Sequence, residues 1–172
     1  MGKRREAREC ALQVLFQLEF DASDVEASLG EYWAGQKPRP DIRDYAGWLV
    51  HGILARKAEI DDLIKGASEH WRLERMGLVD RNILRLAVFE LLEENVLAPP
   101  IIINEAIEIA KKYSDGKSAT FINGILDAVR KKLALPPLPV APDENKEGQH
   151  GPQTKPRNAV RRPGTGPAGQ SR

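Results

Sequence analysis

The chain has 172 residues, 41% of them hydrophobic and 30% charged, and its formal net charge is +1. This length allows one domain with a substantial core, and the near-neutral charge by itself predicts no polyanionic partner. The single cysteine, Cys10, excludes an intramolecular disulfide. With no signal-peptide-like core and no apolar run near the roughly 20 residues that cross a bilayer, we expect a soluble, cytoplasmic protein without a membrane partner.

Apolar residues recur at helical spacing in the first part of the chain and predict four helices there. The first covers about residues 4–20. The second covers 23–33 and the third 41–54, each with its first residue, a serine and an aspartate, as the N-cap. A fourth helix has its apolar positions between residues 60 and 67.

A fifth helix is predicted at residues 79–94, where nearly every position is apolar, which is typical of a central, buried helix. Pro99 and Pro100 then interrupt the chain. Two more helices follow, with apolar faces at 103–110 and 122–129. No strand pattern competes with these helices, so we predict an all-α fold, a compact bundle of about seven helices.

Residues 134–172 differ in composition from the rest of the chain. They include eight of the 12 prolines, no aromatic residue, and six lysines and arginines against three acids. Such a segment cannot bury enough apolar surface to offset the entropy of ordering, so we predict a disordered tail. The domain prediction is a helical domain at 1–133 and a proline- and glycine-rich tail at 134–172.

Four cations form a basic cluster at the start of the first helix, which we call the N-terminal basic cluster. Cations in the first turns oppose the helix dipole, which favours acids there. A solvated helix start is the plain alternative, but a phosphate partner would supply the missing counter-charge. We therefore interpret the cluster as a site for RNA phosphates. Its members are Lys3, Arg4, Arg5 and Arg8.

A polar loop at residues 114–118 joins the sixth and seventh helices. Its Gly-Lys-Ser end looks like a P-loop, but the glycine that this motif requires five positions earlier is Lys111, so no nucleotide site is predicted. The plain interpretation is a connecting loop with Ser118 as the helix cap. The functional one adds RNA contact, because helix N-termini bind phosphate and exposed rings stack on bases. The residues concerned are Lys117, Ser118, Thr120 and Phe121.

Residues that could support catalysis or bind a metal show no diagnostic pattern. The three histidines have no metal-ligand spacing with one another or with Cys10. Adjacent acids such as Asp61 and Asp62 diverge around a helix and are expected to be solvated. We therefore expect no cofactor, no metal and no enzymatic activity.

Three segments resemble the NusB family of transcription antitermination factors and come in the family's order. They are the arginine-rich start at 4–13, the run VDRNILRLAVFEL at 79–91, and the stretch 103–126 with NEAIEIAK and FINGILD. The resemblance spans most of residues 4–133. It implies two subbundles, with helices one to three or four in the first and helices five to seven in the second.

The resemblance also implies a function and its partners. It indicates a non-enzymatic, RNA-binding factor for ribosomal RNA transcription, which binds boxA-like single-stranded RNA together with a small-subunit ribosomal protein, NusE, in an RNA polymerase antitermination complex. Some family members self-associate, which leaves a homodimer open. The alternative function is a helical protein–protein scaffold whose RNA contact is incidental.

The family pattern further assigns individual residues. Phe16 stands where a tyrosine is frequent and joins the RNA-binding set, and Lys117 stands where an acid is frequent. The plain interpretation of Arg85, inside an apolar helix, is a salt bridge between the subbundles with Asp80, Glu105 or a neighbouring acid. The residues implied near the ribosomal partner are Glu74, Asp80, Arg81 and Arg85.

Overall fold

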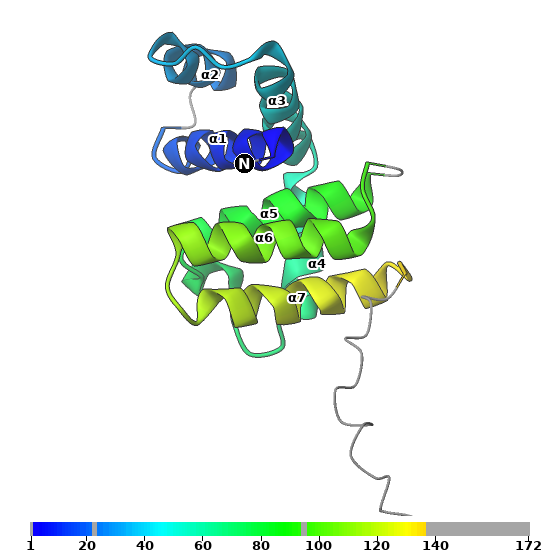
Figure 1. The fold of residues 1–172 in the computed structure, drawn as a ribbon. Coiled ribbons are helices and arrows are strands. Elements are labelled where there is room, and N and C mark those ends of the chain that lie inside the picture. Colours follow the sequence, from blue (N-terminus) through cyan, green and yellow to red (C-terminus); the bar gives the residue numbers. More distant parts are fainter. Residues whose placement is uncertain (1, 22–23, 94–95, 137–172) are drawn as a thin grey trace, which may run out of the picture. The chain divides into compact units, whose positions relative to one another are not determined.

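The computed structural model describes residues 2–21, 24–93 and 96–136, all within the first of two units, Met1–Pro139. These residues form seven α-helices and one short 3-10 helix, and none of them lies in a strand (Figure 1). The predicted all-α class is therefore confirmed. The tail predicted to be disordered lies, from residue 137 onward, outside the described residues.

Most helix boundaries lie within two residues of the predicted ones, but two caps differ. Asp24, whose side chain accepts hydrogen bonds from two backbone N–H groups, caps the second helix, and Ser23 lies outside the described residues. Asp41 is in the first turn of the third helix and not before it, because Pro40 already has a backbone angle suited to a helix start. The helices are α1 (Lys3–Leu18), α2 (Val25–Ala34), α3 (Pro40–Ala55), α4 (Lys57–Ala67), η1 (Leu73–Arg75), α5 (Leu78–Leu92), α6 (Pro99–Tyr113) and α7 (Ser118–Lys132).

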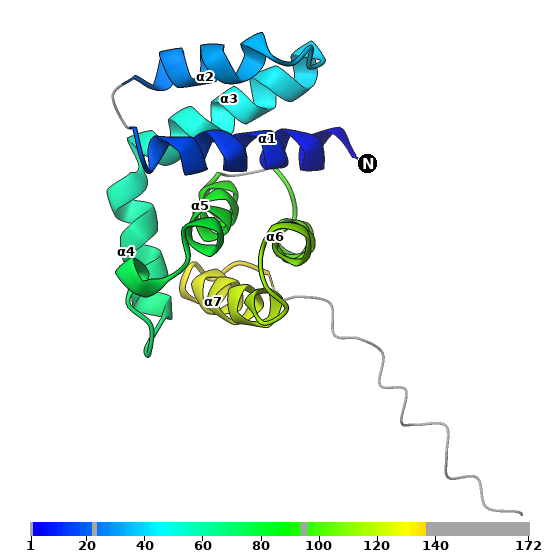
Figure 2. The same cartoon turned by 90° about the vertical axis from the view of Figure 1, so that its left-hand side faces the viewer.

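The helices of this unit pack in two groups. Helix α1 packs mainly against α3, with α2 beside them, while α5, α6 and α7 cluster together (Figures 1 and 2). The resemblance left the place of α4 open, and the structure puts it against α5 and α7, in the second group (Figure 2). Both α1 and α3 contact α5, which joins the two groups.

Helix α5 is the centre of the core, as its apolar sequence predicted. Every residue from position 82 to 91 is buried. The helix contacts α1, α3, α4, α6 and α7, so apolar side chains are covered all around it. Burial of apolar surface on this scale is the main favourable contribution to folding. The three polar residues in this buried run, Asn82, Arg85 and Glu90, must then find partners inside the protein.

Gly52 of α3 faces the ring of Phe89 in α5. A Cβ atom at position 52 would lie 2.0 Å from the Cζ atom of Phe89. The same ring packs against Trp48, with ring centroids 4.8 Å apart, so it has little freedom to move aside. Close packing between helices therefore requires glycine here.

A Gly52→Ala substitution is expected to lower the free energy of unfolding by about 1–3 kcal/mol, the usual cost of overpacking a core. Gly47→Ala on the same helix is the matched control, since a Cβ there would meet nothing within 4 Å. It should be neutral or stabilising by up to about 1 kcal/mol, because alanine is the better helix former. Urea denaturation of both variants measures the difference, and equal effects would contradict the close contact.

Candidate nucleic-acid interface

Arg8 of the N-terminal basic cluster is enclosed by acids from other helices. Arg8 is only 2% exposed, and its guanidinium donates two 2.8 Å hydrogen bonds to the carboxylate of Glu90 in α5. A third nitrogen lies 3.4 Å from Glu105 in α6. Burial alone would lower the pKa of Arg8, but the hydrogen bonds and charge of Glu90 outweigh burial and raise it. The predicted role of Arg8 as a phosphate contact is at odds with this enclosure.

Glu90 joins three helices at one buried carboxylate. Besides the Arg8 guanidinium from α1, it accepts a hydrogen bond from the Tyr45 hydroxyl of α3. Burial raises the pKa of the Tyr45 phenol, and the bond to Glu90 raises it further, so Tyr45 stays protonated and acts as the donor. A buried carboxylate is costly unless it is paired and hydrogen-bonded, and here both conditions are met.

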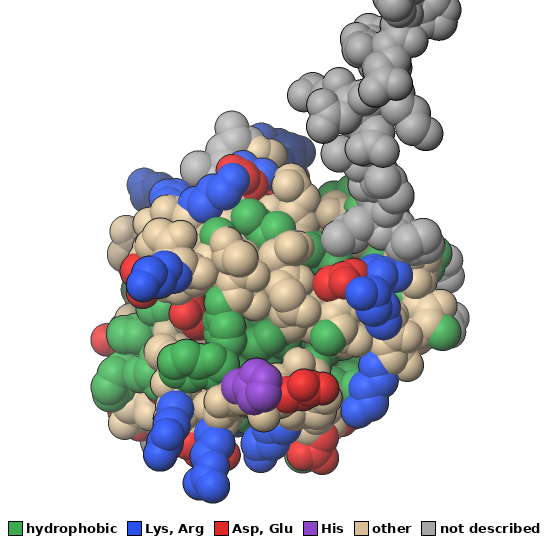
Figure 3. Space-filling view, turned by 90° about the horizontal axis from the view of Figure 1, so that it is seen from below, with side chains coloured by type: hydrophobic (Ala, Val, Ile, Leu, Met, Phe, Trp, Pro, Cys, Tyr) green, Lys and Arg blue, Asp and Glu red, His purple; other side chains and the backbone are tan. Residues whose placement is uncertain are grey.

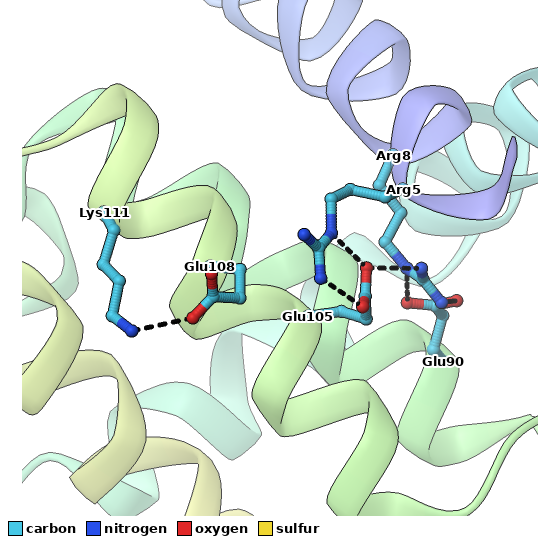
Figure 4. A network of polar contacts seen from close by, with 6 residues as sticks. All are labelled: Arg5, Arg8, Glu90, Glu105, Glu108 and Lys111. Carbon is cyan, nitrogen blue, oxygen red and sulfur yellow. Dashed lines mark hydrogen bonds and ion pairs between the residues drawn. The ribbon is translucent and has the colours of Figure 1, made fainter. Parts of the chain in front are cut away.

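Arg5 forms a second bidentate ion pair, this time at the edge of the protein. Its Nε lies 2.8 Å from Oε2 of Glu105 and its second guanidinium nitrogen 2.7 Å from Oε1 (Figure 4). The hydrogen bond from Arg5 holds the pKa of Glu105 below its usual range, so the pair is ionic at neutral pH. The Arg5 side chain remains 32% exposed. Arg5 therefore still faces solvent while it is paired.

Lys3 and Arg4 are the exposed members of the cluster. The Lys3 ammonium is 2.7 Å from a carboxylate oxygen of Asp41, but both side chains are about half exposed. Arg4 donates to the carbonyl of Val96 at 3.3 Å, and its guanidinium lies 5.6 Å from the centre of the Tyr45 ring. Within the described part of the chain, Arg4 is the cluster member that has no carboxylate partner.

The loop between α6 and α7 is organised by two aspartates. Oδ1 of Asp115 accepts hydrogen bonds from the backbone N–H groups of Lys117 at 2.9 Å and Ser118 at 3.0 Å. These bonds lower the pKa of Asp115 and occupy N–H groups that could have met a phosphate. The Ser118 hydroxyl is buried and lies 2.8 Å from Asp80 in α5. The predicted cap at Ser118 is thus wrong, because Asp115 fills that role and Ser118 fastens the loop to α5.

Beside this loop lies a cleft with aromatic walls. Phe121 is half-buried, and its ring meets Trp71 edge-on, with centroids 6.1 Å apart and an angle of 71°. Trp71 is 56% exposed, and Arg75 and Lys117 also line the cleft. Lys117 and Thr120, two of the predicted RNA contacts, are exposed. Sequence reasoning missed Trp71, although a tryptophan in a segment without helical periodicity was a usable signal.

Figure 3 shows the face of the molecule at the bottom of Figure 1, on the side of α7 and the segment around η1. Hydrophobic side chains are exposed there between separate groups of lysines and arginines (Figure 3). Acidic side chains lie beside several of these basic groups, so the face is not uniformly positive (Figure 3).

Phe16 forms an exposed aromatic pair near the end of α1. Its ring contacts that of Phe20 edge-on, with centroids 5.3 Å apart, and both residues are exposed. Phe16 belongs to the predicted RNA-binding set and Phe20 does not, although a spacing of four positions indicates a shared helix face.

The N-terminal basic cluster contacts α6, and the α6–α7 loop follows the end of the same helix. The cluster reaches α6 at Glu105, and the loop begins after Tyr113. At 1.5 Å per residue, Glu105 and Tyr113 are roughly 12 Å apart along the helix. The two predicted contact regions therefore lie along the same helix, about two turns apart.

Arg85 forms the salt bridge between the helix groups that the sequence predicted, but with other partners. Arg85 is 5% exposed, and two of its guanidinium nitrogens donate to the carboxylate oxygens of Asp61 in α4, at 2.7 and 2.9 Å. It also contacts Glu19, which follows α1, at 2.6 Å. Neither Asp80 nor Glu105 is its partner. Because Arg85 is enclosed in this way, it is not a surface group that another protein could reach.

The other residues implied near a protein partner are mostly engaged internally. Arg81 pairs with Glu19 at 3.2 Å, and Asp80 binds the hydroxyls of the α6–α7 loop. Glu74 is well exposed, and its carboxylate lies 3.9 Å from the ammonium of Lys65. Glu74 is thus the member of this set that remains accessible.

Neither a candidate membrane span nor a candidate metal-binding group is found among the described residues. None of their helices is long and apolar enough to cross a membrane. Their histidine, cysteine and acidic side chains form no group of three or more that could hold a metal ion.

Comparison with known proteins gives consistent matches. The NusB family model matches residues 5–131. The chain is 45% identical over 136 residues to the transcription antitermination protein NusB of Anaeromyxobacter sp. (strain Fw109-5), which covers 78% of this chain and 93% of that protein. The NusB protein of Leptospira biflexa (strain Patoc 1 / Ames) is 41% identical over 139 residues, 81% of this chain and 99% of that protein.

Solved structures agree with these sequence matches. The structure of T. maritima NusB is similar with a TM-score of 0.69 and 40% identity, over 75% of this chain and 91% of that one. A chain in a crystal structure of the antitermination factors NusB and NusE in complex with double-stranded RNA matches with a TM-score of 0.68 and 30% identity, over 77% of this chain and 98% of that one.

The helical fold and these matches define a transcription antitermination factor, a class of protein that is not enzymatic. The chain belongs to the NusB family.

The burial of Arg85 predicts a large loss of stability when it is replaced. Arg85→Met should lower the free energy of unfolding by about 3–5 kcal/mol, because it leaves the carboxylate of Asp61 without its arginine partner and leaves Glu19 paired with Arg81 alone. Arg56→Met is the matched control, since Arg56 pairs with Glu59 and Glu93 nearer the surface. It should cost less than about 1 kcal/mol. Equally small losses in urea denaturation would show that the Arg85 pairs are dispensable.

Proposed function

We propose that the chain is an RNA-binding antitermination factor that acts on ribosomal RNA transcripts. In this proposal it binds boxA-like single-stranded RNA together with a small-subunit ribosomal protein of the NusE type, in a complex on RNA polymerase. The related crystal structure of NusB and NusE with double-stranded RNA supports RNA and a NusE-type protein as partners. The observation that carries the proposal is the solvent-facing edge of the N-terminal basic cluster.

The proposed phosphate contacts are Lys3, Arg4 and the exposed edge of Arg5. Phosphate neutralisation by such cations supplies much of the affinity of proteins for nucleic acids. Arg8 has a different part in this proposal, because its bonds to Glu90 hold α1 in place so that the preceding cations face outward. Affinity from so few exposed cations is modest, which fits a protein that binds RNA together with a partner.

The proposed base contacts are aromatic. Phe121 and Trp71 line the cleft beside the α6–α7 loop, and Phe16 lies with Phe20 near the end of α1. Stacking of a base on an aromatic side chain contributes about 1–3 kcal/mol and tolerates many sequences. Lys117 and Thr120 add polar contacts at the loop.

Removal of the exposed cations should weaken RNA binding in a salt-dependent way. A Lys3→Ala/Arg4→Ala double variant is expected to lower affinity for a boxA-like single-stranded RNA and to flatten the slope of log affinity against log salt by about 0.7 for each phosphate that is no longer neutralised. The control is Lys131→Ala/Lys132→Ala, which also removes two positive charges, but from the last turn of α7. It should leave the slope unchanged. Fluorescence anisotropy at several salt concentrations gives both quantities, and identical slopes for the two variants would exclude the cluster as the phosphate site.

A helical protein–protein scaffold is the second candidate, and a specific observation favours it. Arg5 and Arg8 are neutralised by acids of the same chain, so they do not form a free cationic surface. The exposed Trp71 and the accessible Glu74 could then serve a protein partner alone.

Titration of the RNA with and without the ribosomal partner separates the two functions. The antitermination factor should bind the RNA weakly alone and more tightly once the partner is added, because the partner adds surface and affinity. A scaffold should bind the ribosomal protein while the RNA stays free in both titrations, and that result would reject the proposed RNA-binding function.

A further inference from the structure

We propose that Glu105 is a positioning residue that competes with an RNA phosphate for Arg5 and so sets the affinity of the N-terminal basic cluster. The inference rests on the proposed RNA-binding function. In the RNA-free protein Arg5 is bound to the Glu105 carboxylate, and on RNA binding it exchanges this carboxylate for a phosphate of the RNA. Without RNA, Arg5 therefore stays at the surface as part of an ion pair.

The geometry of the pair matches the geometry of the proposed complex. Both guanidinium–carboxylate bonds of Arg5 are short, at 2.8 and 2.7 Å, and they run in parallel to the two oxygens of Glu105 (Figure 4). Arginine binds phosphate in the same forked, bidentate way. The carboxylate therefore occupies the donors that a phosphate would use, and the 32% exposure of the Arg5 side chain gives a phosphate access to it.

Arg5 and Arg8, the two arginines beside Glu105, differ in whether their removal would leave a buried acid without a cation. If Arg5 leaves, Glu105 keeps a cation, because a guanidinium nitrogen of Arg8 lies 3.4 Å from it. If Arg8 left, Glu90, which is 1% exposed, would keep its buried charge without a cation, and such a change is strongly destabilising. Arg5 can therefore exchange its partner at low cost, while Arg8 is fixed.

Glu108 provides a matched comparison one turn further along α6. It has the same charge and its carboxylate is bonded to Lys111 at 2.7 Å and not to an arginine of α1 (Figure 4). Replacing either glutamate by glutamine removes one negative charge from the same helix. Only the replacement of Glu105 also releases Arg5.

The test measures affinity for a boxA-like single-stranded RNA oligomer in the full chain. Glu105→Gln should tighten binding by about fivefold, which corresponds to the strength of a partly exposed ion pair. Glu108→Gln should change affinity by less than about twofold, as expected for a screened surface charge. In an Arg5→Ala background the two glutamine substitutions should have the same small effect, because the group that Glu105 restrains is gone.

A conservative variant keeps the test decisive if Glu105→Gln folds poorly. Glu105→Asp retains the charge but shortens the side chain, so it should loosen the bidentate pair and give an intermediate gain in affinity. Urea denaturation of each variant establishes that the fold is intact before affinities are compared.

The outcomes distinguish this inference from the function on which it rests. Equal gains from Glu105→Gln and Glu108→Gln, or weaker binding by Glu105→Gln, would overturn the proposed competition for Arg5. Neither result would overturn the proposed RNA-binding function. In the second case Glu105 would be orienting Arg5 for RNA. If the wild-type chain binds no RNA with or without the ribosomal partner, the proposed function fails and the inference fails with it.

Discussion

The buried carboxylate of Glu90 fixes how α1 lies on the rest of the molecule. An ionised group with 1% exposure is tolerated only when charge and hydrogen bonds compensate its lost hydration, and Arg8 and Tyr45 provide both. Arg8 must therefore point inward. Once it does, Arg5 reaches the edge acid Glu105, and the cations before it face solvent.

A second buried guanidinium repeats this arrangement at the other end of α1. Arg85 in the central helix binds Glu19, which follows α1, and Asp61 of α4. The two helix groups are thus joined by charge pairs near both ends of α1 as well as by the apolar core. Such pairs contribute little compared with an apolar alternative, but they specify one arrangement because breaking either leaves an unpaired buried charge.

These pairs also divide the cations of the chain by role. Arg8 and Arg85 are structural, Arg4 and Lys3 face solvent, and Arg5 stands between the two classes. In the proposed function this leaves a small cationic surface, with aromatic side chains supplying contacts further along the protein. A factor of this kind depends on a partner for affinity, and a residue such as Glu105 can adjust that affinity without touching the RNA.

The sequence by itself determined the number and order of the helices, the central place of α5 and the family, because helical periodicity and short motifs are local properties of the chain. It did not place α4, and it assigned the α7 cap to Ser118 and not to Asp115. Above all it could not tell which arginines were free. The pairs that decide this join residues 82 positions apart, for Arg8 and Glu90, and 100 apart, for Arg5 and Glu105. Only the tertiary structure brings such residues together, so only it separates the charges that hold the fold from those that can meet a partner.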